Sequence, residues 1–194
     1  MGGGTSCFDR ISKDDLIFAF FPCIYFSCLN QMAMSWGYTN YRKLNTRQAT
    51  DAILERVKNR EYFFGLAVKM LSVAKERGLR MIMENPWSEQ TYLKANFVMP
   101  PTLVDNDRTK RGDYYVKPTA YWFINFEPKN GKSFQVSHKP KAIIKCKMSG
   151  KAGICSMERS MICPDYARNF ICDFIVGKEQ PNITQLNLFN NENN

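Results

Sequence analysis

The sequence has few of the features that mark zinc proteins and membrane proteins. It contains one histidine, and its seven cysteines form no C-x-x-C pair, so the spacing does not favour a zinc site. The longest apolar run, Leu16 to Leu29, carries Pro22 and is shorter than the roughly 20 residues that cross a bilayer. It also follows Lys13-Asp14-Asp15, which is the wrong flank for a secretory signal. We therefore expect no metal, no membrane contact, and a cytoplasmic protein with reduced thiols.

Nothing in the composition indicates overall disorder, a collagen-like repeat or a coiled coil. The 194 residues are 44% hydrophobic and 23% charged, which is close to the average for globular proteins. The length fits one domain of ordinary size, with or without a tail. We expect a flexible leader over residues 1–15, a folded domain over residues 16–177, and an asparagine-rich, disordered tail over residues 178–194.

Positive charge is in excess and unevenly distributed. Lys and Arg total 27 against 18 acids, for a net charge of +9, which favours polyanionic partners. Seven lysines lie between Lys129 and Lys151, where no acid occurs. This stretch is either a solvated loop or edge strand, or a surface that contacts phosphates.

Hydrophobic patterning predicts alternating strands and helices. Residues 16–21 are continuously apolar and end at Pro22, as a buried strand does. Asn45 or Thr46 can cap a long helix whose stop signal is Gly78. In all, we expect strands at residues 16–21, 79–83, 119–125 and 141–147, and helices at residues 46–77, 88–96 and 164–176.

Strand, helix, strand, helix, strand is the order of an α/β protein with a parallel sheet. Such sheets carry their chemistry at the carboxyl ends of the strands. Phe21-Pro22-Cys23 follows the first strand, and Glu84-Asn85-Pro86 follows the second. If these strands are neighbours, Cys23 and Glu84 lie close together although 61 positions separate them.

A cysteine held past a strand end by a proline is a candidate nucleophile. A carboxylate at the end of the adjacent strand could hold or donate a proton on the other side of a substrate. Pro22-Cys23 alone favours a buried structural thiol, because buried cysteines commonly end strands. Its pairing with Glu84 favours the catalytic interpretation.

Two motifs resemble those of DNA (cytosine-5) methyltransferases. Pro22-Cys23-Ile24-Tyr25-Phe26-Ser27 is similar to their Pro-Cys-x-x-Phe-Ser motif, and Met83-Glu84-Asn85-Pro86 is similar to their Glu-Asn motif. The likeness is closest to a divergent phage and prophage branch. It extends over about Asp14 to Val176 and includes the stretches Glu84–Ser88, Arg111–Asn125 and Glu158–Ile162.

The resemblance implies a Rossmann-like fold of the S-adenosylmethionine-dependent type and methylation of double-stranded DNA, in a bacterial or phage-infected cell. The target cytosine would be flipped out of the duplex. The thiolate of Cys23 would add to ring carbon 6, Glu84 would bind and protonate the base edge, and Asn85 would hold the loop. The residues implied to bind substrate or DNA are Pro22, Ser27, Arg108, Lys110, Arg111 and Lys117.

The sequence departs from the family where the methyl donor should bind. The family's Gly-rich loop should precede the Pro-Cys strand by several tens of residues, but only fifteen residues precede Leu16, and Gly2-Gly3-Gly4 does not follow a strand. The main S-adenosylmethionine-binding loop is therefore not expected in this chain. We expect the catalytic carboxyl-terminal half of a methyltransferase, either truncated or acting with a separate amino-terminal half.

The tail carries a second resemblance. Its residues Gln185, Leu186, Leu188 and Phe189 match the peptide by which bacterial DNA enzymes dock on the sliding clamp. A flexible peptide would bury the two apolar side chains in a preformed pocket. The alternative is a chance match in a solvated tail.

Two other functions remain open. One is a non-catalytic remnant that binds DNA or the sliding clamp. The other is a DNA amino-methyltransferase, because Asn85-Pro86-Trp87 faintly resembles the Asn-Pro-Pro-Tyr motif of those enzymes, although the second proline is absent. Trp122 and its aromatic neighbours are expected to pack a core rather than stack on a base.

Overall fold

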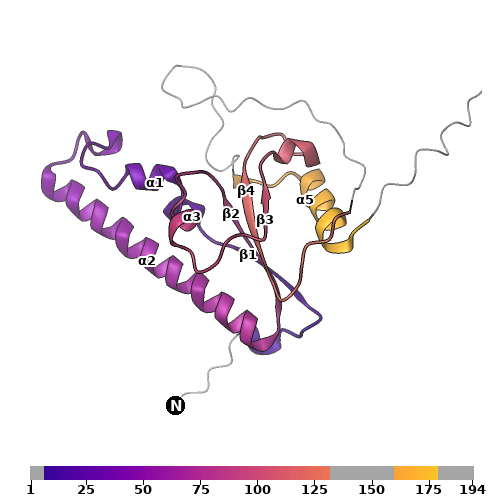
Figure 1. The fold of residues 1–194 in the computed structure, drawn as a ribbon. Coiled ribbons are helices and arrows are strands. Elements are labelled where there is room, and N and C mark those ends of the chain that lie inside the picture. Colours follow the sequence, from indigo (N-terminus) through magenta and orange to yellow (C-terminus); the bar gives the residue numbers. More distant parts are fainter. Residues whose placement is uncertain (1–6, 132–159, 179–194) are drawn as a thin grey trace, which may run out of the picture. The chain divides into compact units, whose positions relative to one another are not determined.

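The computed structural model describes residues 7–131 and 160–178 of the chain. The protein forms two compact units (Figure 1). The first comprises Met1–Asn106 and Lys117–Glu127, and the second comprises Asp107–Val116 and Pro128–Asn194. Most of the predicted elements belong to the first unit. The sequence does not reveal that a short segment between two strands of the first unit belongs to the second.

The first unit contains a four-stranded mixed sheet with the order β1-β2-β4-β3. Strand β1 (Leu16–Phe20) is parallel to β2 (Arg80–Pro86), whereas β4 (Thr119–Ile124) is antiparallel to both β2 and β3 (Leu103–Asp105). The α/β class is confirmed, but the expectation of an all-parallel sheet is wrong. A parallel return needs a crossover that packs a helix on the sheet. Between β2 and β4 the described chain has only two short helical elements, the five-residue helix α3 (Tyr92–Asn96) and the four-residue turn η4 (Arg108–Arg111).

Helix α2 (Thr46–Arg77) is the crossover between the two parallel strands, and its predicted ends are confirmed. The Asn45 side chain accepts a hydrogen bond from the Gln48 amide at 2.9 Å, and the Gln48 side chain accepts one from the Asn45 amide at 3.1 Å. This reciprocal capping box satisfies two amides that would otherwise lack partners. At the other end, Gly78 adopts a left-handed conformation with φ of 68°, which glycine tolerates at little cost.

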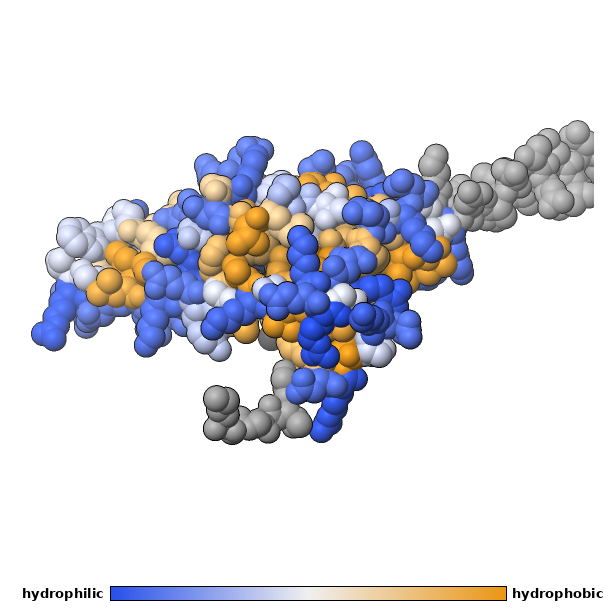
Figure 2. Space-filling view, turned by 60° about the horizontal axis from the view of Figure 1, so that its bottom comes forward, coloured by the Kyte–Doolittle hydropathy of each residue, from blue (hydrophilic) through white to orange (hydrophobic). Residues whose placement is uncertain are grey.

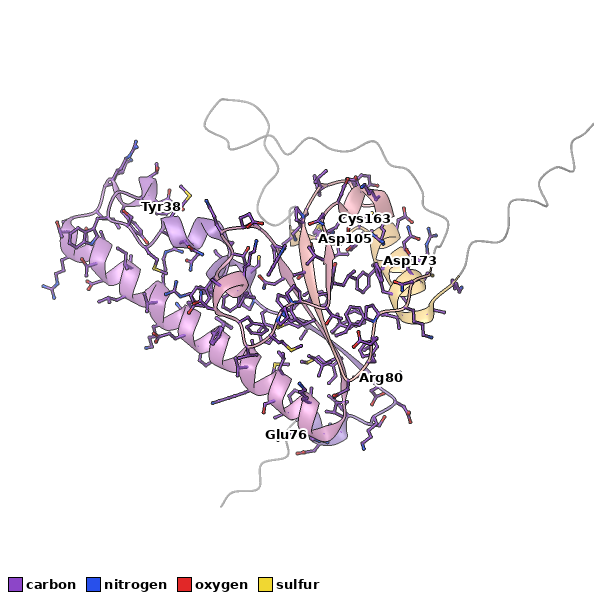
Figure 3. All side chains as sticks on the ribbon, in the orientation of Figure 1. Tyr38, Glu76, Arg80, Asp105, Cys163 and Asp173 are labelled. Carbon is purple, nitrogen blue, oxygen red and sulfur yellow. The ribbon has the colours of Figure 1, made fainter. Side chains whose placement is uncertain are left out.

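The core of the first unit lies between α2 and one face of the sheet, as the side chains in Figure 3 show. Ala67, Leu71 and Ala74 form the buried face of the helix. Met83 and Trp122 belong to the same cluster from the sheet side. Because the indole nitrogen of Trp122 donates to the Met99 carbonyl at 3.0 Å, its one polar atom is satisfied, and its predicted core role is confirmed.

Strand β2 is longer than predicted. It continues through Glu84, Asn85 and Pro86, so these residues are the last of the strand and do not follow it. The reason is pairing on both sides, because Glu84 lies opposite Phe20 of β1 and Tyr121 of β4. The predicted strand ended at Met83 because the run of apolar residues ends there.

The chain between β1 and α2, for which the sequence predicted no helix, contains short helical turns. These are η2 (Cys23–Tyr25), α1 (Cys28–Met32) and η3 (Thr39–Tyr41). The expected flexible leader also contains a turn, η1 (Cys7–Arg10). Phe8 and Ile11 pack against the core, so hydrophobic burial orders this part of the leader.

The second unit contains η4 (Arg108–Arg111), α5 (Pro164–Phe170) and η6 (Ile171–Val176). The predicted closing helix is thus α-helical for two turns and then widens into a π-helix before Gly177, which has φ of 72°. The strand predicted at residues 141–147 lies outside the described residues.

The described surface mixes apolar and polar side chains, and hydrophobic patches lie among hydrophilic residues on the face drawn in Figure 2. None of the described helices combines the length and the apolar character that a membrane span requires. Within residues 7–131 and 160–178, no three His, Cys, Asp or Glu residues gather in a way that could hold a metal ion.

Candidate active site

The two strands that carry the predicted catalytic motifs are neighbours, as the sequence predicts. In the parallel register Leu16 lies opposite Arg80 and Phe20 lies opposite Glu84. Cys23 comes three residues after the end of β1. Because parallel strands end at the same edge, Cys23 and Glu84 both lie at the carboxyl edge of the sheet. Residues far apart in the sequence are thus brought to one place by a single β-α-β unit.

Cys23 is the first residue of the η2 turn, and the backbone fixes its position. Pro22 precedes the turn with φ of −59°, the value that its ring imposes. The Cys23 carbonyl accepts hydrogen bonds from the amides of Phe26 at 3.0 Å and Ser27 at 2.9 Å. Cys23 is half-buried, so this turn presents a thiol on an ordered backbone rather than on a free loop.

Glu84 and Asn85 point to opposite faces of the sheet, because successive strand residues alternate. Met83, two residues before Asn85, belongs to the core cluster that contains the α2 residues. Asn85 is therefore on the α2 side and Glu84 on the other. Glu84 is 9% exposed, so its carboxyl group is largely withdrawn from water. A withdrawn carboxyl group is the type that can exchange a proton with a bound substrate.

Asn85 is the most unusual polar residue at this edge. It is 1% exposed, and neither its amide nitrogen nor its side-chain oxygen has a hydrogen-bond partner among the described residues. A buried amide without partners costs stability. Such a group is typical of a site in which a ligand or a rearranged loop supplies the missing partners.

A network that sequence reasoning missed holds the turn that carries Cys23. The Asn30 side chain, which is buried, donates to the Tyr25 carbonyl at 2.8 Å and accepts from the Arg56 guanidinium at 3.2 Å. Arg56 also donates to the Tyr41 hydroxyl at 3.0 Å, and Tyr41 donates to the Ala33 carbonyl at 3.0 Å. Helix α2 is thereby connected to η2. No local motif could have revealed this network, because its members meet only in the fold.

The loops after β1 and β2 also contact each other directly. The Tyr92 amide donates to the Phe26 carbonyl at 2.9 Å, and the Gln31 side chain donates to the Gln90 carbonyl at 2.6 Å. The Arg60 guanidinium lies over the Tyr92 ring, 4.5 Å from its centre. These contacts fix the loop of the thiol against the loop that follows the carboxyl group.

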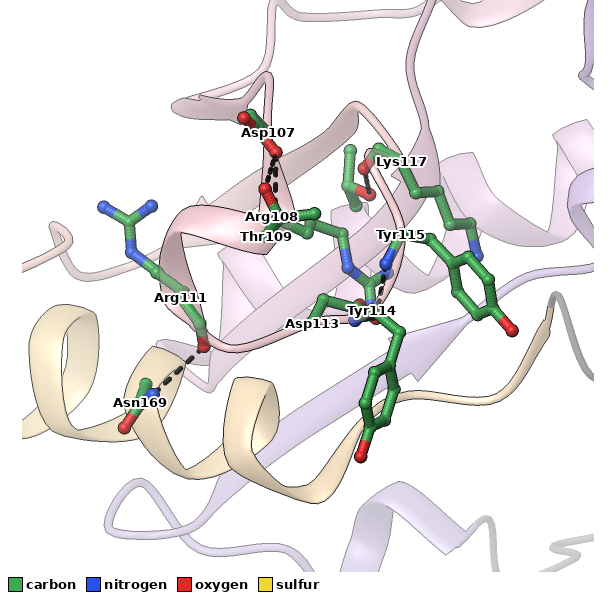
Figure 4. A network of polar contacts seen from close by, with 10 residues as sticks. Asp107, Arg108, Thr109, Arg111, Asp113, Tyr114, Tyr115, Lys117 and Asn169 are labelled. Carbon is green, nitrogen blue, oxygen red and sulfur yellow. Dashed lines mark hydrogen bonds and ion pairs between the residues drawn. The ribbon is translucent and has the colours of Figure 1, made fainter. Parts of the chain in front are cut away.

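Arg108, predicted to contact DNA, is a buried structural residue in this conformation. Its guanidinium is 2.5 Å from the Asp113 carboxylate, and the two side chains are 1% and 3% exposed. The same guanidinium lies 4.2 Å from the centre of the Tyr166 ring. Figure 4 shows Arg108 and Asp113 facing each other across the turn. A charge so enclosed does not reach a phosphate without unfolding this cluster.

Arg111 is similarly engaged in the second unit. Its guanidinium is 3.4 Å from the Asp173 carboxylate and 4.6 Å from the Phe174 ring centre. Its carbonyl accepts from the Asn169 side chain at 3.0 Å, the dashed contact in Figure 4. Lys110 is exposed and Lys117, in the first unit, is half-buried. The DNA-contact prediction therefore depends on these two lysines more than on the arginines.

The described residues do not supply the glycine-rich cradle that would hold S-adenosylmethionine. The three described glycines with positive φ, Gly78, Gly112 and Gly177, each end a helical segment. The turn after β1 is Phe21-Pro22-Cys23, and β2 is followed by Trp87 and Ser88. The predicted clamp-binding residues lie outside the described residues.

Comparison of the chain with family models, curated proteins and solved structures finds no match. The placement of Cys23, Glu84 and Asn85 at one sheet edge is therefore the observation from which function is argued.

Proposed function

We propose that this protein performs the covalent chemistry of a DNA (cytosine-5) methyltransferase, with Cys23 as nucleophile and Glu84 as its acid. The carrying observation is that β1 and β2 are parallel neighbours whose carboxyl ends hold the half-buried thiol and the largely buried carboxyl group. This is the edge where α/β sheets place their chemistry. The motif resemblance and the excess of positive charge support the same substrate.

The step assigned to these residues is addition to the base. The sulfur of Cys23 bonds to carbon 6 of an extruded cytosine, and the electron pair of the 5,6 double bond moves toward ring nitrogen 3. Glu84 donates a proton there, so negative charge does not accumulate on the base. Carbon 5 becomes nucleophilic. Carbon 5 takes up a proton from water and then loses the hydrogen that it first carried as a proton. The thiolate leaves, and the proton on nitrogen 3 returns to the Glu84 carboxylate, which restores the ring.

The Asn30–Arg56–Tyr41 network suits this chemistry because it positions the turn and not the thiol itself. It holds the backbone of the turn from which the Cys23 thiol is presented. Placement within a fraction of an ångström accounts for a large part of the rate in covalent catalysis. Asn85, with its two unpartnered amide atoms, is the group that a bound base or a closed loop would satisfy.

The sheet also supports an interaction with a further polypeptide. Among the described strands β1 is at the edge, and its Phe18 and Phe20 are exposed. An open edge with apolar side chains is a template for another strand. We assign the donor-binding half of a Rossmann-like methyltransferase sheet to this edge, because the described residues do not fit the donor. No step that involves the donor is assigned to them.

The test is exchange of hydrogen at carbon 5, which requires the adduct but not the donor. Duplexes of randomised sequence with tritium on cytosine carbon 5 are incubated with the full chain. The adduct takes up a proton from water and releases tritium. We expect Cys23→Ser to abolish release and Glu84→Gln to lower it by about 10²–10⁴-fold.

The matched control is Cys172→Ser, which removes another half-buried thiol. Release should be unchanged in this variant. Release that persists in Cys23→Ser, or no release from the unaltered chain, contradicts the proposal and favours a protein that binds DNA without acting on it.

A further inference from the structure

A basic and aromatic surface lies at the amino-terminal end of α2. We define it by four exposed residues, Trp36, Arg42, Lys43 and Arg47. Trp36 is 65% exposed. The other two tryptophans pack in the first unit, where their rings are 6.0 Å apart, and Trp122 is completely buried. Trp36 is thus the one tryptophan of the three that is exposed, and it lies in the same segment of the chain as three exposed cations. An exposed aromatic ring combined with cations is the composition of a surface that binds nucleic acid.

The charge of this surface is not compensated. No acid occurs between Asp15 and Asp51 in the sequence. None of the three cations forms an ion pair with a carboxylate among residues 7–131 and 160–178. Cations without carboxylate partners attract anions from solution. The surface therefore favours a polyanion.

The backbone that carries the surface is anchored. Tyr41 is buried and is hydrogen-bonded to the Ala33 carbonyl and to Arg56 of α2. The Tyr38 ring packs edge-on against Tyr41 with 5.2 Å between ring centres, and Figure 3 shows Tyr38 beside the start of α2. Trp36 is thus displayed from an ordered turn, so binding does not have to order this segment.

We propose that this surface binds single-stranded nucleic acid. An unpaired base stacks on Trp36, while Arg42, Lys43 and Arg47 contact the phosphates on either side. A base inside a duplex is already stacked, so it offers no free face to the indole. The inference goes beyond the proposed function because it uses neither Cys23 nor Glu84.

A lipid surface fits these residues less well. Insertion into a bilayer needs a contiguous apolar face. Over residues 32–47 the only exposed large apolar side chains besides Trp36 are Met32 and Leu44, and the exposed polar residues Ser35, Thr39 and Asn40 lie between them in the chain. Hydroxyl and amide groups can instead bond to sugar and phosphate oxygens. Binding to anionic vesicles is therefore an alternative that the experiment tests.

The test measures fluorescence polarization of a labelled oligothymidine of about 16 nucleotides, the upper site size of one single-strand-binding fold, with the full chain. We expect Trp36→Ala to weaken binding about tenfold. The double variant Arg42→Glu/Lys43→Glu should weaken it more and should lower the slope of log affinity against log salt by about 1.4.

Matched controls change the same properties elsewhere on α2. Tyr62 is also 65% exposed, and Tyr62→Ala should bind normally. Lys69→Glu/Lys75→Glu reverses two exposed charges and should have a small effect. Cys23→Ser should bind like the unaltered chain, which separates this inference from the proposed function.

A second readout protects against misfolded variants. Acrylamide should quench the exposed Trp36 in the unaltered chain, and the oligonucleotide should shield it. The inference is overturned if the surface and control variants lose affinity equally, if the oligonucleotide leaves quenching unchanged, or if the chain binds phosphatidylserine vesicles but not the oligonucleotide.

Discussion

The two units differ in whether their buried polar side chains have partners. In the second unit, two arginine guanidinium groups lie against buried carboxylates, with the buried Arg108 on Asp113 and the half-buried Arg111 on Asp173. At the carboxyl edge of the sheet in the first unit, the buried amide of Asn85 has no partner among the described residues. Paired charges stabilise a fold but are unavailable to a ligand, whereas an unsatisfied group costs stability and is available. The comparison supports the sheet edge, rather than the arginine cluster, as the place for the proposed chemistry.

The largest stability effect should follow from breaking the paired cluster. Asp113→Ala leaves the Arg108 guanidinium buried without its carboxylate, which should cost about 3–5 kcal/mol. Glu89→Ala removes the carboxylate of an exposed ion pair with Lys94 and should cost less than about 1 kcal/mol. Urea unfolding of both variants measures the difference. Equal losses would show that Arg108 is not held by Asp113.

The second-largest loss of stability should follow from replacing Asn30 of α1, whose side-chain amide has hydrogen-bond partners. Asn30 is buried and hydrogen-bonded to both Tyr25 and Arg56. Asn30→Leu leaves these partners without their hydrogen bonds and should lower the free energy of unfolding by about 1–3 kcal/mol. It should also speed alkylation of Cys23, because the turn that carries the thiol is released. Lys58→Ala, an exposed change on the helix α2 that carries Arg56, is the control. Slower or unchanged alkylation would argue against a positioning network.

Replacing Asn85, whose side-chain amide has no partners among the described residues, should change stability in the opposite direction. Asn85→Leu removes two buried polar atoms without partners and keeps a similar volume, so stability should stay the same or rise by up to about 1 kcal/mol. Tritium release from carbon 5 should nevertheless fall. A loss of stability as large as that of Asn30→Leu would mean that Asn85 has partners in solution, and the comparison between the two amides would fail.

The smallest expected effect on stability concerns the turn before β1. The Ser12 amide donates to the Asp15 carboxylate at 2.8 Å, and this hydrogen bond lowers the pKa of Asp15. A lowered pKa in the folded state means that the carboxylate stabilises the fold above its ordinary pKa of about 3.9, and that this contribution is lost as pH falls through the folded value. The difference in melting temperature between the unaltered chain and Asp15→Asn should therefore be present at neutral pH and vanish in acid. A difference that does not depend on pH would contradict this origin.

Capping residues and apolar runs in the sequence predicted those elements whose limits depend on neighbouring residues. The caps of α2 and the apolar run of β1 follow from the sequence. The neighbouring positions of Cys23 and Glu84 followed from the α/β pattern. The three-residue β3 and the antiparallel direction of β4 did not, because short strands show no periodicity and direction depends on what the connection can pack.

Charge was the least reliable guide. Arg108 and Arg111 suggested a phosphate surface in the sequence, but both are paired inside the second unit. The partner of Arg108 is five positions away, whereas that of Arg111 comes from η6, a contact that only the fold creates. The partners of Asn30 were likewise not predictable, since Arg56 is 26 positions along the chain.

The central claim is that the parallel pair of β1 and β2 brings Cys23 to a base together with Glu84. The most direct test is intact-mass spectrometry of the full chain incubated with randomised duplexes in which pyrimidin-2-one replaces cytosine. Without the 4-amino group, carbon 6 is a better electrophile and the sulfur adduct accumulates. We expect a protein–DNA adduct that maps to the peptide containing Cys23, persists in Cys172→Ser, and is absent in Cys23→Ser. No adduct, or an adduct on Cys172, would contradict the account.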